Sequence, residues 1–305
     1  MCWRLLCRTF TQNYEEAKMV ANRSFNLGRL FIYGCLLAFA LFYLAPLYVM
    51  LTTSFKDIEE IRSGNLLALP QDPTLYAWIK AWSSACTGSE CQGLAPFFMN
   101  SVKIVVPAVI ISTVIGALNG YVLSKWRFRG SDLMFGMLLF GCFIPFQVIL
   151  LPMARLLAEL GLANTVTGLV LVHVIYGVAF TTLFFRNFYV SVPTELVKAA
   201  QLDGASFFQI FRHIFLPVSL PIFTVTIIWQ FTQIWNDFLF GVVYSGPGTQ
   251  PITVALNNLV NTSMGGKEYN VDMAAAVIAA LPTLLVYIFA GKYFVRGLTA
   301  GAVKG

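Results

Sequence analysis

Six stretches of the chain contain no Asp, Glu, Lys or Arg and consist mostly of apolar residues. At a rise of about 1.5 Å per residue, each is long enough as a helix to cross the roughly 30 Å hydrocarbon core of a bilayer. The alternating apolar and polar pattern of a transmembrane β-barrel is absent. The sequence therefore predicts an all-α membrane protein with six transmembrane helices, at residues 30–51, 104–123, 133–154, 160–185, 214–236 and 273–291.

The basic residues are distributed unevenly between the two sides of this predicted bundle. Of the 20 Lys and Arg residues, fourteen share a side with the amino terminus, five fall in the opposite segments, and Lys103 lies at the edge of a span. Cytoplasmic segments of membrane proteins carry the excess of Lys and Arg. We therefore predict that both termini are cytoplasmic and that the chain is a multi-pass protein of the cytoplasmic (inner) membrane.

This orientation divides the chain into a leader, a membrane domain and its connections. Residues 1–29 form a cytoplasmic leader, which either lies along the membrane surface or is disordered, and residues 30–305 form one six-helix domain. The connections are outer loops at 52–98 and 242–271, a cytoplasmic loop at 190–217 and a cytoplasmic tail at 297–305. Long outer loops suit the docking of an external partner, and simple solvated connectors are the alternative.

Composition and charge narrow the class of protein. With 58% hydrophobic and only 11% charged residues, an ordinary soluble enzyme is excluded. A net charge of +6 would suggest a nucleic-acid partner in a polar chain. Here the same residues set the topology, and attraction to anionic lipid accounts for them equally well. We therefore predict contact with membrane lipid and none with nucleic acid.

The six cysteines separate by predicted compartment. Only Cys86 and Cys91 fall on the outer side, where an oxidising environment permits a disulfide, and the chain between them is short enough to let them meet. We predict that these two residues are bridged. No CxxC pair and no His/Cys cluster with metal-ligand spacing occurs, so we predict no metal site.

Candidates for catalysis are few. The chain has two histidines, no HExxH and no convincing GxSxG, and Gly266-Lys267 is followed by Glu268 where a phosphate-binding loop needs Ser or Thr. We therefore expect a non-catalytic chain that binds no nucleotide or other cofactor itself. His173 lies alone among apolar residues of the fourth span, either as a hydrogen-bonded contact between helices or as part of a proton path.

Polar residues gather at the outer end of the fifth span. Counted from Pro217, Asp237 lies about 30 Å along a helix, close to the outer surface. It is either an interfacial acid or part of a pore mouth that binds a polar, ring-shaped solute by hydrogen bonds and aromatic stacking. An aromatic belt at the membrane interface explains the tryptophans without a ligand. The candidate residues of this solute path are Trp229, Gln233, Trp235, Asn236 and Asp237, with Gln230 beside them.

The cytoplasmic loop between the fourth and fifth spans predicts a helix, a glycine and a second helix. Pro193 and Glu195 suit the first turn of a helix, and Gly204 can end it in the left-handed conformation. The alanines Ala199 and Ala200 permit close approach of another protein. From the residues alone, this pattern indicates an amphipathic surface hairpin.

The same loop resembles a known family motif. Lys198-Ala199-Ala200, Asp203-Gly204-Ala205 and the later Ile214-Phe215-Leu216-Pro217 are similar to the EAA loop of ABC importer permease subunits. Residues 297–305 resemble the tail of the carbohydrate-uptake branch, in the subunit that corresponds to the second permease of the maltose transporter, and the Trp235-Asn236-Asp237-Phe238 run is frequent there. The first outer loop with its cysteine pair is similar to the glucose and mannose subgroup.

The resemblance implies a six-helix permease of the MetI-like fold that is coupled to a separate ATPase. In that family the EAA loop is a coupling helix seated in a cleft of the ATPase, and the tail reaches toward the ATPase dimer. One departure is Lys198, which replaces the family glutamate, and Glu195 lies one turn earlier and can supply the anion instead. The implied contact residues are Glu195, Lys198, Ala199, Ala200, Asp203, Gly204 and Ala205 in the loop, and Thr299 and Lys304 in the tail.

The resemblance also implies the partners. These are a second permease subunit that completes a heterodimer, an ATPase dimer that holds ATP and Mg, and an external solute-binding protein that delivers a sugar. Residues 257–266 of the last outer loop occupy the position from which the maltose relative contacts its binding protein.

Two other classes of protein compete with this interpretation. A self-sufficient secondary transporter or channel would need ionisable residues in its spans, and a membrane-embedded enzyme would need a convergent nucleophile, base or metal set. The charge-free spans disfavour the first class, and the absence of such a set disfavours the second.

Overall fold

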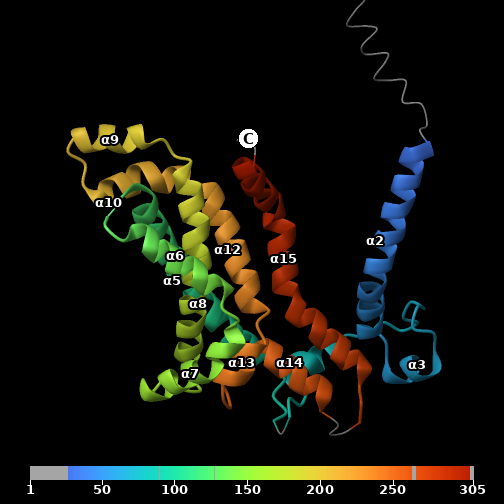
Figure 1. Ribbon diagram of the computed structural model, residues 1–305. Helices are drawn as coiled ribbons and strands as arrows, with labels where there is room; N and C mark the ends of the chain where they lie inside the picture. The colour runs from blue at the N-terminus through green and yellow to red at the C-terminus, as the bar shows by residue number, and fades with distance from the viewer. Residues whose placement is uncertain (1–26, 89, 127, 263–265, 303–305) are drawn as a thin grey trace, which may run out of the picture.

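The computed structural model describes residues 27–302 except 89, 127 and 263–265, with side chains up to residue 291 (Figure 1). Within these residues every regular secondary-structure element is a helix, which confirms the predicted all-α class. The helices are α2 Leu27–Ser54, α3 Ile58–Ser63, α4 Tyr76–Ser83, α5 Ala95–Lys125, α6 Ser131–Phe143, α7 Phe146–Glu159, α8 Val166–Val190, α9 Thr194–Leu202, α10 Phe207–Ile210, η1 Phe211–Phe215, α11 Leu216–Val218, α12 Leu220–Trp235, α13 Leu239–Tyr244, α14 Ile252–Asn261 and α15 Tyr269–Ala302.

Four helices of the described chain are long and apolar enough to cross a membrane singly. Two further spans are helix pairs with a sharp bend, Ser131–Phe143 with Phe146–Glu159 at 102° and Phe207–Val218 with Leu220–Trp235 at 78°. Six spans result when each bent pair counts as one, in agreement with the prediction. The single spans are Gly28–Ser54, Ala95–Lys125, Val166–Val190 and Tyr269–Gly291.

The third span is not the continuous helix that the sequence predicted at residues 133–154. It breaks at Ile144, whose φ of −68° and ψ of 123° are extended. Pro145 explains the break, because a proline lacks an N–H and disfavours helical geometry in the residue before it. The α7 arm runs on to Glu159, so α8 begins at Val166, later than the predicted start of the fourth span.

The fifth span, predicted at residues 214–236, also bends. The break lies at Ser219, between α11 and α12, and Pro221 follows directly in the first turn of α12. Because Pro221 has no N–H, it leaves the carbonyl of Pro217 without its usual helical donor. The Ser219 hydroxyl lies 2.9 Å from the Tyr189 hydroxyl of α8, which fixes the corner to the neighbouring helix.

The outer connections contain more structure than the predicted loops. Helices α3 and α4 lie within residues 52–98, and the second half of α13 and all of α14 lie within 242–271. Figure 1 shows α3, α7, α13 and α14 at the bottom, and the start of α2, α9, α10 and the end of α15 at the top. The two ends of the described chain therefore share a side, as predicted.

Small residues bring the central helices α5 and α8 together. A Cβ added at Gly116 would lie 2.3 Å from Thr181 Oγ1, and one added at Gly120 would lie 2.6 Å from Phe185 Cβ. Close approach of this kind supplies van der Waals contact in a membrane, where the hydrophobic effect between helices is weak.

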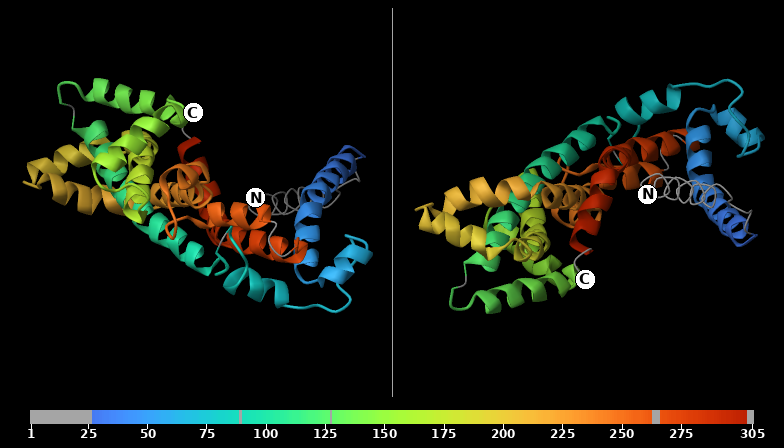
Figure 2. Two further views of the ribbon diagram at one scale, coloured as in Figure 1. Left: turned by 90° about the horizontal axis from the view of Figure 1, so that it is seen from below. Right: turned by 90° about the horizontal axis from the view of Figure 1, so that it is seen from above.

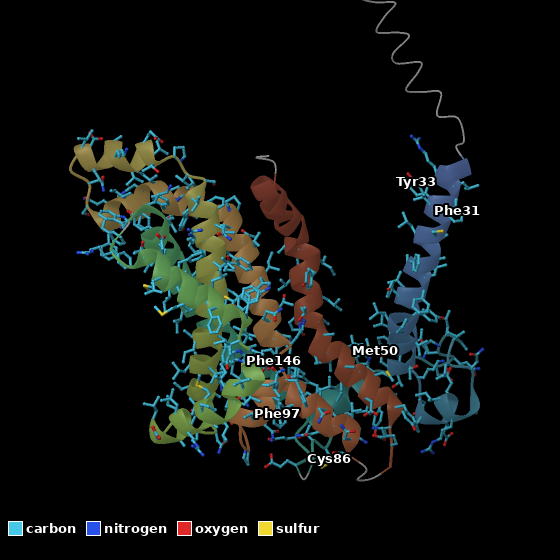
Figure 3. All side chains as sticks on the ribbon, viewed as in Figure 1. Phe31, Tyr33, Met50, Cys86, Phe97 and Phe146 are labelled. Carbon is cyan, nitrogen blue, oxygen red and sulfur yellow. A yellow bond between two sulfur atoms is a disulfide. The ribbon has the colours of Figure 1, made fainter. Side chains whose placement is uncertain are left out.

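Helix α2 lies apart from this central pair. It contacts α15, and in both views of Figure 2 it occupies the end of the molecule opposite α9 and α10. None of the residues in its most apolar window is buried within the chain. Figure 3 shows Phe31 and Tyr33 on its upper half, away from every other element. Its side chains are therefore available to lipid or to another membrane protein.

Candidate functional site

A groove of about 740 Å³ lies between α6, α7, α8, α12 and α13. Most of its surface is apolar, and its polar groups come from the second half of α12, from the residues that follow it, and from α8. Because α6 and α7 diverge at Pro145, both arms of the bent span contribute to its wall. The polar side chains that line it include His173, Tyr176, Gln230, Thr232, Gln233, Asn236 and Asp237.

Helical periodicity places three of the predicted solute-path residues on one side of α12. Trp229, Gln233 and Asn236 are spaced by four and three residues, so they share a face, and all three line the groove. The Trp229 ring packs against two rings of α8, with centroid distances of 5.0 Å to Phe180 and 5.4 Å to Phe184. These contacts fix the indole while one side of it faces the groove.

Trp235, predicted as part of the same path, does not line the groove. Two residues after Gln233, it points to the opposite side of α12, where its Nε1 donates to the Ala279 carbonyl of α15 at 2.9 Å. Its ring stacks on Phe231, with centroids 5.7 Å apart and planes 10° apart, and it is 3% exposed. Trp235 therefore fastens α12 to α15.

Gln230 was a minor candidate in the sequence and is buried beside the groove. A Cβ at Gly177 would lie 1.8 Å from its Nε2, so only a glycine on α8 leaves room for this amide. The pairing of Gly177 with Gln230 could not be seen in the sequence, because the two residues are far apart in the chain.

Asp237 lies in the joint between α12 and α13 and has two roles. Its Oδ1 accepts from the Phe240 N–H at 3.3 Å and its Oδ2 from the Gly241 N–H at 3.1 Å, so it caps the start of α13. Its backbone carbonyl accepts from the Thr253 hydroxyl of α14 at 2.6 Å. The carboxylate also lines the groove, so Asp237 both caps α13 and contributes a charge to the groove wall.

The same joint reaches two other helices. The Nε2 of His173 on α8 lies 3.8 Å from Asp237 Oδ2, and the Thr283 hydroxyl of α15 donates to Asn236 Oδ1 at 3.3 Å. The separation of His173 from Asp237 is too long for a direct hydrogen bond, and the His173 ring also packs against the Phe240 ring of α13 with centroids 5.5 Å apart. The joint connects the groove to α8, α13, α14 and α15.

These groups can bind an uncharged polar solute. Amide and carboxylate side chains exchange hydrogen bonds with hydroxyl groups, and the indole of Trp229 offers a flat apolar face. No group of three or more His, Cys, Asp or Glu residues suited to a metal ion occurs in the part of the chain that the structure describes.

The predicted coupling residues lie on α9 and on the turn after it, at the cytoplasmic end. Gly204 has a φ of +80°, and the Ala205 N–H donates to the Ala200 carbonyl at 2.9 Å, which closes the helix. Of the predicted contacts, Ala200 and Ala205 are half-buried. The exposed ones are Glu195, Lys198, Ala199, Asp203 and Gly204.

A cluster of buried aromatic and aliphatic side chains lies between the α9–α10 element and the helices α5 and α8. Val197 of α9, Ile210 of α10 and Phe215 of η1 pack against Tyr121 of α5 and Tyr189 of α8. The ring centroids of Tyr121 and Phe215 are 4.5 Å apart. These side chains therefore join α9, α10 and η1 to α5 and α8 in one packed cluster.

Apolar residues on the outside of the element were missed by the sequence analysis. Leu202 at the end of α9 is 89% exposed and Phe208 on α10 is 69% exposed. Both residues lie beside the turn at Gly204, and large apolar side chains exposed on a helix hairpin are available to a partner protein. The signal was available in the sequence, since both residues flank the glycine turn.

The predicted tail contacts lie outside the residues whose side chains the structure describes. Thr299 belongs to α15, but only its backbone is described, and Lys304 follows the last described residue.

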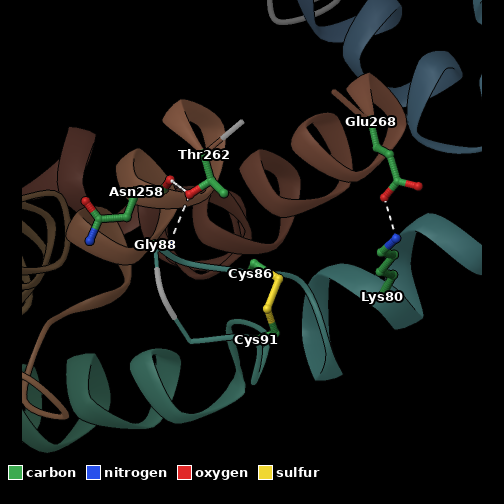
Figure 4. The surroundings of a disulfide bond; sticks show 7 residues. All are labelled: Lys80, Cys86, Gly88, Cys91, Asn258, Thr262 and Glu268. Atoms are coloured by element: carbon green, nitrogen blue, oxygen red, sulfur yellow. Dashed lines mark hydrogen bonds and ion pairs between the residues drawn. A yellow bond between two sulfur atoms is a disulfide. The ribbon is translucent and has the colours of Figure 1, made fainter. Parts of the chain in front are cut away.

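The outer face carries the cysteine pair. Cys86 and Cys91 are joined by a disulfide, and the Gly88 N–H within this loop donates to the Thr262 hydroxyl after α14 at 3.0 Å (Figure 4). Nearby, the Lys80 ammonium of α4 pairs with Glu268 just before α15, and this hydrogen bond raises the pKa of Lys80. The cysteine loop and α4 are thus connected to the segment between α14 and α15.

Comparison with known proteins identifies the family. Residues 112–299 match the family described as "Binding-protein-dependent transport system inner membrane component". The chain is 46% identical over 188 residues to the probable ABC transporter permease protein PH1216 of Pyrococcus horikoshii, covering 61% of this chain and 68% of that protein. It is 32% identical to the xylose/arabinose import permease protein XacI of Haloferax volcanii, covering 96% of this chain and 98% of that protein. It is 31% identical to the glucose import system permease protein GlcU of Saccharolobus solfataricus, covering 90% and 95%.

Solved structures share the fold. A bacterial ABC transporter chain involved in import of the polysaccharide alginate superposes with a TM-score of 0.77 at 22% identity, covering 90% of this chain and 98% of that chain. A chain of the MetNI methionine ABC transporter superposes with a TM-score of 0.50 at 18% identity, covering 67% and 95%. The family match and the full-length relatives together show that this chain belongs to the family of inner membrane components of binding-protein-dependent transport systems, as a transport subunit located in the inner membrane.

Proposed function

We propose that the chain is a permease subunit of a sugar importer and that its groove forms part of the path of the sugar. The observation that carries this proposal is the shared face of Trp229, Gln233 and Asn236 along one wall of the groove. An aromatic face flanked by amides is suited to a sugar ring, which has apolar C–H faces and a rim of hydroxyl groups. The names of two full-length relatives, which import xylose/arabinose and glucose, support the same solute class.

The subunit works as half of a heterodimer with a second permease. None of the residues in the most apolar window of α2 is buried within this chain, so α2 offers apolar surface to another membrane protein. Family membership favours this arrangement over a self-sufficient secondary transporter or channel.

On the cytoplasmic side, α9 and α10 receive the movement of a separate ATPase dimer, which holds the ATP and Mg. The exposed residues Lys198, Asp203 and Leu202 offer charged and apolar contacts to that partner. Lys198 reverses the charge of the family motif, and Glu195, one turn earlier on the same helix, supplies the acidic group. The ring cluster around Tyr121 carries the movement to α5 and α8.

On the outer side, a solute-binding protein delivers the sugar to the face that carries α14. Asp237 supports this route, because its backbone carbonyl is bonded to Thr253 of α14 while its carboxylate lines the groove. Residues 257–266, predicted to contact the binding protein, include the last turn of α14, and 263–265 lie outside the described residues. Docking on this face can thereby alter the outer end of the groove.

The test is ATP-dependent uptake by the purified complex in lipid vesicles, with the external binding protein supplied. A panel of labelled monosaccharides and short oligosaccharides identifies the solute, and Gln233→Ala should raise the sugar concentration needed for half-maximal uptake. Uptake by the chain alone, driven by an ion gradient and indifferent to ATP, would contradict the proposal.

A further inference from the structure

A short turn in the first outer connection presents leucines to its surroundings. Residues 65–69 join α3 to the segment before α4, and Leu66, Leu67 and Leu69 are 56%, 60% and 68% exposed. Exposed large apolar side chains that gather in one small region mark a contact surface.

The turn lies beside the spanning part of α2. The hydroxyl of Tyr48 donates to the Leu67 carbonyl at 2.9 Å. Tyr48 precedes the last residue of α2, Ser54, by six positions, which is about 9 Å along the helix axis. Figure 1 shows the chain near α3 rising alongside the lower end of α2. The leucines are therefore at the depth of the outermost turns of the span.

Several polar backbone groups of the turn are bonded within the protein. Asn65 accepts from the Leu67 N–H through its side chain at 2.9 Å and from the Ala68 N–H through its carbonyl at 3.1 Å. The Lys56 ammonium also donates to the Asn65 carbonyl at 3.1 Å, and Lys56 is only 2% exposed. Internal bonding of this kind is what a non-helical segment needs when it leaves water.

The acidic residues Glu59 and Glu60 lie on α3, and the basic residue Lys56, which contacts the turn, is buried. Glu60 accepts from the Gln71 N–H at 3.0 Å, which holds the acidic helix against the segment that follows the turn. The connection is thus divided into acidic residues on α3 and at Asp72, and leucines between them. This is the division expected of a segment at a membrane surface.

The apolar surface continues from the turn onto α2. Leu47, Leu51 and Tyr48 on the adjacent turns of α2 are each about 40% exposed, and α2 as a whole crosses the membrane. We propose that Leu66, Leu67 and Leu69 insert among the lipids of the outer leaflet, where headgroups meet acyl chains, and anchor the outer end of α2. The partner at this outer end of α2 is the lipid, which covers apolar side chains without requiring complementary polar groups, and the rest of α2 stays open to the second permease.

A fluorophore at position 69 tests the insertion. In a variant with Cys2, Cys7, Cys35 and Cys142 replaced by serine and the outer disulfide kept, Leu69→Cys is labelled with an environment-sensitive dye. The complex with its co-purified partners is then reconstituted in vesicles. Lipids that carry a nitroxide near the headgroup should quench the dye strongly, and aqueous iodide should quench it roughly threefold less than at an exposed site, as expected for a segment inserted into the interface.

Two matched positions calibrate the result. Ser63→Cys on α3 reports a site exposed to water, and Phe42→Cys on α2, where the side chain is 72% exposed, reports a site within the span. Quenching by iodide at position 69 equal to that at position 63 would place the turn in water. Protection from both quenchers would mean that another protein covers the leucines. Either outcome overturns the proposal.

Discussion

The groove and the cytoplasmic element differ in how far apart along the chain their supporting residues lie. The groove is formed by side chains of five helices between Met137 and Phe240. The element of α9 and α10 is shaped by local features, such as the left-handed Gly204 and the bond from Ser206 N–H to Gln209 Oε1 at 2.7 Å. The shape of this element therefore depends on residues close together in the sequence, and only the packing of Tyr121 and Tyr189 beneath it comes from distant segments of the chain.

This difference indicates what a substitution should do in each region. A change in the cytoplasmic element should alter the transmission of movement and leave the affinity for the solute intact. A change in the groove should alter affinity and leave the coupling to ATP hydrolysis intact. The two regions can therefore be separated by measuring uptake, half-saturating sugar concentration and ATP hydrolysis in the same vesicles.

The largest effect is expected from Gly204→Val. At a φ of +80°, a β-branched residue is strained and should unravel the end of α9. The left-handed conformation costs a residue with a Cβ about 1–2 kcal/mol, and a β-branched residue more. Since about 1.4 kcal/mol corresponds to a factor of ten, we expect ATP-dependent uptake to fall by about tenfold or more. The half-saturating sugar concentration of the residual uptake should not change.

Gly204→Asn is the matched control, because asparagine tolerates the left-handed conformation far better. It should retain most of the uptake. Equal loss in both variants would show that the glycine is needed for space and not for its backbone conformation, although no atom lies within 4 Å of a Cβ added there.

The groove is tested by Gln233→Ala. Loss of one hydrogen bond of about 0.5–1.5 kcal/mol should raise the half-saturating sugar concentration roughly two- to tenfold. ATP hydrolysis stimulated by the binding protein should keep its maximal rate. A fall in that rate at saturating sugar would assign Gln233 to coupling and would remove the distinction between the two regions.

The outer disulfide should affect stability, and neither sugar affinity nor the coupling to ATP hydrolysis. Replacing Cys86 and Cys91 with serine removes a cross-link that closes a loop of about six residues, which contributes about 2 kcal/mol in the chain-entropy treatment. The midpoint of thermal unfolding should fall while the half-saturating sugar concentration remains the same. In the unsubstituted protein these sulfurs should resist a maleimide until a reductant is added, and labelling without reductant would argue against the bridge.

Trp235→Phe separates the two tryptophans of α12. The variant loses the hydrogen bond to the Ala279 carbonyl and should lower the free energy of unfolding by about 1 kcal/mol. Trp229→Phe, in the groove, should instead weaken sugar uptake with little effect on stability. If Trp235→Phe weakened sugar affinity more than Trp229→Phe, the assignment of the two faces of α12 would be wrong.

The sequence predicted the spans, their orientation and the glycine turn because these depend on local composition and spacing. The bends at Ile144 and Ser219 were harder to predict from the sequence. Prolines mark where a helix can break, but the angles of 102° and 78° depend on the helices that pack against each arm.

Only part of the groove could be predicted, because its lining also depends on how distant helices pack. Periodicity places Trp229 and Trp235 on different faces of α12, but which face lines a cavity depends on the position of α15, whose carbonyl at Ala279 binds Trp235. The closeness of His173 to Asp237 and the fit of Gln230 beside Gly177 arise from segments remote in the chain. Hydrophobic patterning carries no information about such pairs.

The smallest effect is expected at the ion pair between Lys80 and Glu268, which lies outside both regions. The pKa of Lys80 is raised in the folded protein, chiefly by its hydrogen bond to Glu268, so the pair stabilises the fold below the ordinary pKa of lysine. This contribution is lost as the pH rises through the raised pKa. For a partly exposed pair we expect about 0.2–1 kcal/mol. Lys80→Gln should therefore lower the unfolding midpoint slightly at neutral pH and flatten its decline at alkaline pH. Uptake and sugar affinity should remain unchanged. A change in either would mean that a contact on the outer face alters the groove through α15.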